Sequence, residues 1–108
     1  MANLWHLPAE LGGPTELFEC LAQGEGVRIE RIVSCGQCTP AGQWYDQPQD
    51  EWVVLLQGSA HLAYADGRTR VLNAGDWLVL PAHCRHRVES TSRDPPCIWL
   101  AVHARLSG

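Results

Sequence analysis

From residue 27 to residue 103, short apolar and β-branched runs alternate with turn residues, and this pattern constrains the fold more than any other feature. Within each run the side chains of a strand point alternately to two faces. Seven such runs are present: Val27–Val33, Glu51–Gln57, Ala60–Ala65, Arg70–Leu72, Trp77–Leu80, His86–Glu89 and Ile98–His103. Short strands joined by turns are typical of a sandwich or barrel, so residues 27–104 are expected to form an all-β barrel core.

The N-terminal part, residues 1–26, follows a different pattern. Leu17, Phe18 and Leu21 fall at helical spacing, and Gly24 is placed to end the turn. We therefore expect an N-terminal arm that contains one short helix, attached to the barrel that follows it.

The size and charge of the chain restrict what else it can be. Its 108 residues fit a single domain, 1–108, without room for a second core. The formal net charge is −4 and the arginines are scattered, so no basic stripe is available for nucleic acid or for an anionic membrane surface. No stretch reaches the roughly 18 consecutive apolar residues of a membrane helix. No secretory signal follows Met1, so a cytoplasmic location is expected.

The chain contains an odd number of cysteines: Cys20, Cys35, Cys38, Cys84 and Cys97. They are expected to stay reduced, most of them as small core residues. Cys35 and Cys38 have the spacing of a redox dithiol or of half a zinc site. Neither a helix N-terminus nor a second cysteine pair accompanies them, so those functions are the weaker interpretation.

Polar residues gather just before two of the predicted strands. Trp44-Tyr45-Asp46-Gln47 precede Glu51, which opens one strand, and residues 81–86 precede another. In a closed sheet, residues at strand ends can converge on one rim. Val53 and Leu55 lie on the same face of their strand as Glu51. If these two residues fill the barrel, Glu51 points into its mouth.

The second of these segments resembles a motif of the cupin superfamily. Gly75, Pro81 and His86 stand at the positions of that motif's glycine, proline and histidine. The departures are His83, in place of a second glycine, and Ser90, in place of a terminal asparagine. The resemblance extends from residue 34 to residue 103 and implies a double-stranded β-helix, the jelly-roll barrel of the cupins.

Glu51 and Gly58 have the spacing that ends the other cupin motif. That motif normally carries two histidines three or four residues before the glutamate. Here a three-residue gap selects Tyr45 and Gln47, and a four-residue gap selects Trp44 and Asp46. Two of the family's four usual metal ligands are therefore replaced.

The resemblance implies a divalent metal, with iron, manganese, nickel and zinc as candidates, in an altered site. Glu51 and His86 carry over directly, and Gln47 could supply an amide oxygen. The additional candidate ligands are Asp46 and His83. The candidates for the wall of an adjoining ligand pocket are Trp44, Tyr45 and His103.

Simpler interpretations of the same residues stay open. Glu51 could be a solvated strand-end acid, and His86 a hydrogen-bonded histidine. His83 could be a turn residue or a donor to a ligand residue. Most of the five tryptophans fit core or dimer-interface positions, with Trp44 the best candidate for a pocket wall.

Two functions of different classes follow from this pattern. The first is a metal-dependent enzyme on a small organic substrate: a dioxygenase, an isomerase or a lyase. The second is a non-enzymatic domain that binds or senses a small molecule without a tightly bound metal. The missing histidine pair favours the second, and the sequence alone does not decide whether the protein is an enzyme.

The N-terminal residues Leu4, Trp5 and Leu7 are apolar and have no obvious core of their own to join. We expect a homodimer in which this segment is buried against the partner chain.

Overall fold

The computed structural model describes residues 2–106, which form eight β-strands and no helix. The strands are β1 (Leu17–Gly24), β2 (Val27–Ser34), β3 (Asp50–Gln57), β4 (Ser59–Tyr64), β5 (Thr69–Asn73), β6 (Trp77–Leu80), β7 (His86–Thr91) and β8 (Cys97–Ala104). All seven strands expected from the sequence are present, each within two residues of its expected bounds. Within the described range, nothing forms a helix that is long and apolar enough to cross a membrane.

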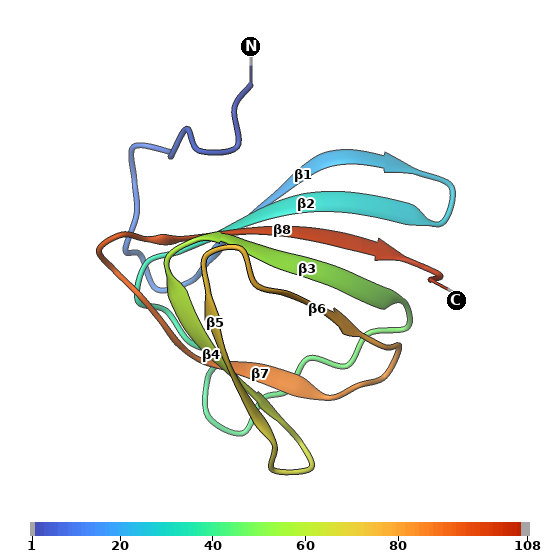
Figure 1. The fold of residues 1–108 in the computed structure, drawn as a ribbon. Coiled ribbons are helices and arrows are strands. Elements are labelled where there is room, and N and C mark those ends of the chain that lie inside the picture. The colour runs from blue at the N-terminus through green and yellow to red at the C-terminus, as the bar shows by residue number, and fades with distance from the viewer. Residues whose placement is uncertain (1, 107–108) are drawn as a thin grey trace.

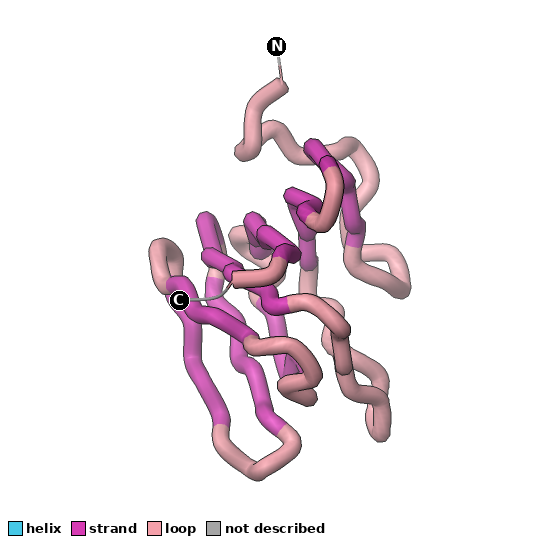
Figure 2. Tube along the Cα trace, turned by 90° about the vertical axis from the view of Figure 1, so that its right-hand side faces the viewer, coloured by secondary structure: helices cyan, strands magenta, loops and turns pink. Residues whose placement is uncertain are grey.

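The strands build two antiparallel sheets, which Figure 1 shows as a jelly roll. One sheet has the order β1-β2-β8-β3-β6, and the other has the order β5-β4-β7. The chain crosses between the sheets from β3 to β4, from β5 to β6, from β6 to β7 and from β7 to β8, whereas β4 and β5 pair within one sheet. Figure 2 shows strands and loops alone in the described chain. The expected all-β, double-stranded β-helix is therefore confirmed.

The expected N-terminal helix is absent, and that prediction was wrong. Leu17–Gly24 forms β1, which pairs antiparallel with β2 and places Phe18 opposite Ile32. The register shifts between Cys20 and Ala22, so Leu21 is an extra residue in a bulge. This bulge breaks the alternation of the strand and produces the spacing that imitates a helix face. Pairing with β2 also supplies backbone partners along the whole segment, whereas an isolated helix of this length is marginal.

Two glycines of the motif-like segments have a backbone that favours glycine. Gly58 lies between β3 and β4 with a φ of +93°, and a Cβ there would lie 2.8 Å from Ser92 Oγ and 2.9 Å from Cys97 Sγ. Gly75, between β5 and β6, has a φ of +94°, but a Cβ there would meet nothing within 4 Å. Both positions need a positive φ, and only Gly58 also leaves no room for a side chain.

The N-terminal arm is attached to the five-stranded sheet of its own chain. The Arg31 guanidinium on β2 donates to the carbonyl oxygens of Leu4 at 2.9 Å and of His6 at 2.7 Å. The same guanidinium forms an ion pair with Glu19 of β1. These bonds hold the arm beside β1 and β2, while the Trp5 side chain stays exposed.

The hydrophobic core lies between the inner faces of the two sheets. It contains Val53, Leu55, Ala60, Leu62, Leu72, Leu80, Val88, Cys97, Trp99 and Ala101. All five cysteines are unpaired thiols, and Cys97 alone is fully buried in this core. The core fills one end of the space between the sheets and leaves the other end open.

Candidate functional site

A cavity of about 520 Å³ lies between the inner faces of the two sheets. Its less polar wall consists of Phe18, Cys20, Ile32, Val53, Leu62, Leu80, Val88 and Trp99. Its polar lining consists of Glu16, Arg28, Glu30, Tyr45, Gln47, Glu51, His86 and His103. Several wall residues also belong to the core, so the cavity continues the core outward. Apolar walls with a few converging polar groups are the usual features of a small-molecule site.

The register of the five-stranded sheet arranges the inward side chains in rows. Arg28 of β2 lies opposite His103 of β8, which lies opposite Glu51 of β3. This polar row runs near the strand ends. Four residues further along β2, Ile32 lies opposite Trp99, in an apolar row. The cavity is therefore polar at its mouth and apolar towards the core.

Glu51 is the most buried acid of the cavity, with an exposure of 6%. Its Oε1 accepts a hydrogen bond of 2.7 Å from Gln47 Nε2. Because a carboxylate can only accept, this bond fixes the orientation of the Gln47 amide. Glu51 forms no ion pair with any of the residues 2–106.

His86 faces the cavity from the other sheet, with an exposure of 5%. It exchanges two backbone hydrogen bonds with Tyr45, of 2.7 and 3.2 Å, and the two rings stack with centroids 5.5 Å apart. His86 Nδ1 lies 2.8 Å from the carbonyl oxygen of Cys84. Since a carbonyl only accepts, Nδ1 carries a proton, and Nε2 of the neutral ring keeps its lone pair.

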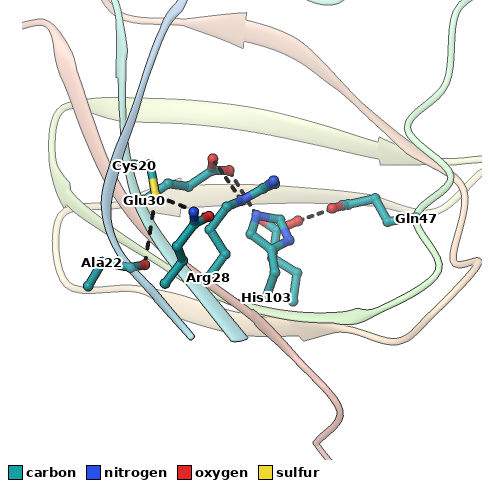
Figure 3. A network of polar contacts seen from close by, with 8 residues as sticks. Cys20, Ala22, Arg28, Glu30, Gln47 and His103 are labelled. Atoms are coloured by element: carbon teal, nitrogen blue, oxygen red, sulfur yellow. Dashed lines mark hydrogen bonds and ion pairs between the residues drawn. The ribbon is translucent and has the colours of Figure 1, made fainter. Parts of the chain in front are cut away.

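His103 and Glu30 form a buried pair at the cavity mouth. His103 Nε2 lies 2.8 Å from Glu30 Oε1, and both side chains are at least nine-tenths buried. Glu30 Oε2 lies 3.6 Å from Arg28 Nε, whose side chain is about half exposed. Figure 3 shows these three side chains converging on one another. The Glu30 carboxylate orients the imidazole, so Nδ1 of neutral His103 is the atom with a lone pair.

A second polar group joins two lining residues, Glu16 and Trp99. Ser34 Oγ donates to Glu16 Oε2 and accepts a bond of 3.1 Å from Trp99 Nε1. Burial raises the pKa of Glu16, and the hydrogen bond from Ser34 opposes that rise. The indole and the carboxyl group are thus both held by one hydroxyl.

The Tyr45 hydroxyl lies in a negative field. Burial raises the pKa of Tyr45, and the negative charges of Glu16, Glu51 and Glu30 raise that pKa further. Tyr45 therefore stays a neutral phenol at physiological pH, able to donate or accept one hydrogen bond.

Three of the residues singled out in the sequence lie outside the cavity lining. The Asp46 carboxylate lies 2.8 Å from His83 Nδ1, and both side chains are largely exposed in neighbouring loops. Trp44 packs near the guanidinium groups of Arg85 and Arg87, at 5.8 and 6.0 Å from its ring. The structure instead brings together Tyr45, Gln47, Glu51, His86 and His103.

The side chains of the cavity do not fit a conventional metal centre. Among the described residues, no group of three or more His, Cys, Asp and Glu side chains is placed to hold a metal ion. The Gln47 amide turns its nitrogen towards Glu51, and Glu30 occupies His103 Nε2. Such an arrangement lacks the three or four converging ligand atoms that a bound transition metal needs.

Several lining residues were missed from the sequence, notably Glu16, Arg28, Glu30 and Trp99. Arg28, Glu30 and Ile32 alternate along β2, so a charged pair on the same strand face as an apolar residue was a usable signal. What the sequence could not supply is the pairing of β2 with β8, which brings Glu30 beside His103.

Comparisons with known proteins agree with this architecture. The family model described as "Cupin domain" matches residues 37–103. A crystal structure from Ralstonia eutropha JMP134, which carries the provisional name mannose-6-phosphate isomerase, shares 48% identity over 98% of each chain, with a TM-score of 0.88. No functionally curated protein matches the chain.

More distant structures share the fold alone. A cupin superfamily protein from Desulfitobacterium hafniense is 22% identical, covers 93% of this chain and 84% of its own, and has a TM-score of 0.75. A cupin domain from Bordetella pertussis is 19% identical over 90% of this chain and 100% of its own, with a TM-score of 0.68. With its family-model match and its jelly roll, the chain belongs to the cupin domain family.

Proposed function

We propose that this cupin domain binds a small organic molecule in the cavity between its sheets, without a tightly held metal. The observation that carries the proposal is the cavity itself, in which apolar walls from both sheets meet a polar mouth. Tyr45, Gln47, Glu51, His86 and His103 are the residues that would contact the polar part of the ligand. In the described part of the chain no three metal-ligating side chains converge, which supports a function in which the side chains bind the ligand directly.

The proposal can be tested with a neutral probe, benzyl alcohol, titrated into isotopically labelled protein and followed by amide NMR spectra. We expect the shifts to concentrate at Tyr45, Val53, His86 and Trp99. These residues surround the cavity from both sheets.

Two matched variants localise the binding. Val88 lines the cavity and is buried, whereas Val71 is 58% exposed on β5 and outside it. Val88→Trp should fill the cavity and remove the shifts, and Val71→Trp should leave them unchanged. Shifts that are absent in the wild type, or that persist in Val88→Trp, would refute the proposed pocket.

A second candidate is isomerisation of a sugar phosphate, which the name of the 48% identical Ralstonia protein favours. Acid–base groups for such a reaction would be His86 Nε2 and the His103–Glu30 pair. However, among the described residues the one arginine or lysine in the lining is Arg28, which already faces Glu30. NMR spectra of mannose 6-phosphate incubated with the protein test this candidate, because conversion would produce the signals of a ketose phosphate.

A further inference from the structure

The cavity presents hydrogen-bond acceptors with very few donors. Glu51, His86 and His103 are each more than nine-tenths buried. Each keeps a polar atom without a hydrogen bond to another residue in the range 2–106: Glu51 Oε2, His86 Nε2 and His103 Nδ1. The donor positions of both rings are occupied by Cys84 and Glu30. A ligand that satisfies these atoms must therefore bring donors of its own.

The charges of the cavity lining also favour a ligand that brings hydrogen-bond donors, and in particular a cation. Three carboxylic acids, Glu16, Glu30 and Glu51, line the cavity, against one arginine. That arginine, Arg28, is about half exposed and faces Glu30 at 3.6 Å. Glu51 lies on β3, which β8 separates from β2; it has no ion-pair partner in the described chain and receives a single bond, from a neutral amide. A buried carboxylate of this kind is stabilised by an added positive charge.

Three aromatic rings line the same cavity, and one of them contacts an acceptor. Tyr45, Trp99 and Phe18 all line the cavity, and the Tyr45 ring stacks against His86. The faces of aromatic rings attract cations as well as apolar groups. Val53 and Leu62 continue the wall towards the core and offer no polar atom to a ligand.

We propose that the ligand is an organic amine in its protonated form, with the ammonium group at Glu51 and His86 and the apolar part against Val53, Leu62 and Trp99. This inference rests on the proposed function, since it names the chemical class of the molecule in the same cavity. The N–H groups of the ammonium meet acceptors, and its charge meets the unpaired carboxylate. A sugar phosphate would instead bring negative charge next to Glu30 and Glu51.

A series of three probes of matched shape tests the charge: benzylamine, benzyl alcohol and benzoate. At pH 7 these are a cation, a neutral molecule and an anion on the same ring. We expect benzylamine to bind about tenfold more tightly than benzyl alcohol, and benzoate to show no binding. Calorimetry gives the affinities, and NMR shifts at His86 and Trp99 locate each probe.

Two variants separate the local charge from the charge of the whole protein. Glu51→Gln should lower the benzylamine affinity by about tenfold and leave benzyl alcohol unchanged. Glu25→Gln removes the same charge from the exposed turn between β1 and β2 and should leave both affinities unchanged. The wild-type series tests the inference even if Glu51→Gln does not fold.

The outcomes distinguish the inference from the proposed function. If all three probes bind with equal affinity, or benzoate binds most tightly, the cavity is a pocket but the ammonium inference is wrong. If no probe shifts the cavity resonances, the proposed function fails as well. Mn²⁺ added alone provides a further test. If one equivalent of Mn²⁺ broadens the resonances of Glu51 and His86 and prevents benzylamine from binding, the site holds a metal and the amine inference is wrong.

Discussion

Gly58→Ala tests how the fold joins its two sheets, because Gly58 connects β3, the strand that carries Glu51, to β4 in the opposite sheet. Two effects add at this position. A φ of +93° costs an alanine about 1–2 kcal/mol. The new Cβ would also lie within 2.9 Å of Ser92 Oγ and Cys97 Sγ, and overpacking of that kind costs about 1–3 kcal/mol. The expected loss is therefore about 2–5 kcal/mol.

Gly67→Ala is the matched control. Gly67 has nearly the same φ, +94°, but a Cβ there would meet nothing within 4 Å. Its substitution should cost the backbone term alone, about 1–2 kcal/mol. Urea unfolding followed by tryptophan fluorescence gives both free energies, provided that the m-value is unchanged. A Gly58→Ala loss no larger than that of Gly67→Ala would refute the close packing described between Gly58, Ser92 and Cys97.

Three further predictions concern the cavity and the assembly. Since burial raises the pKa of Glu16, its contribution to stability is greatest below the unfolded pKa and is lost as pH rises through the folded value. Glu16→Gln should therefore gain stability relative to wild type between acidic and neutral pH, and a constant difference in urea unfolding would contradict this. Glu30→Gln and His103→Gln should show a coupling of about 1–3 kcal/mol in a double-mutant cycle, whereas additive losses would mean that the pair does not interact. The homodimer stays a prediction, and light scattering that detects only monomer would remove it.

The part of the fold that sequence could predict is the part that depends on local pattern. Alternation in β3 put Glu51 on the face of Val53 and Leu55, and all three are buried. Alternation could not be recognised in β1, because the extra residue in the bulge at Leu21 turns a period of two into apparent helical spacing. Pairing with β2 across the two-residue turn at Glu25 and Gly26 decided that segment.

The candidate site was predictable to the same extent. Spacing from the motifs identified Glu51 and His86, which the structure places in one cavity. Spacing also selected Asp46 and His83, but their loops turn both side chains outward, where they contact each other. Glu30 entered the site through the register of β2 on β8, a pairing between residues about 70 positions apart in the sequence.

The most direct test of the central claim is elemental analysis of untagged protein after incubation with iron, manganese, nickel or zinc and removal of the excess. We propose an organic ligand, and no tightly held metal, among Glu51, His86 and His103. We therefore expect far less than one metal ion per chain, with the same low content in Glu51→Ala and His86→Ala. One metal ion per wild-type chain, lost in both variants, would contradict this proposal.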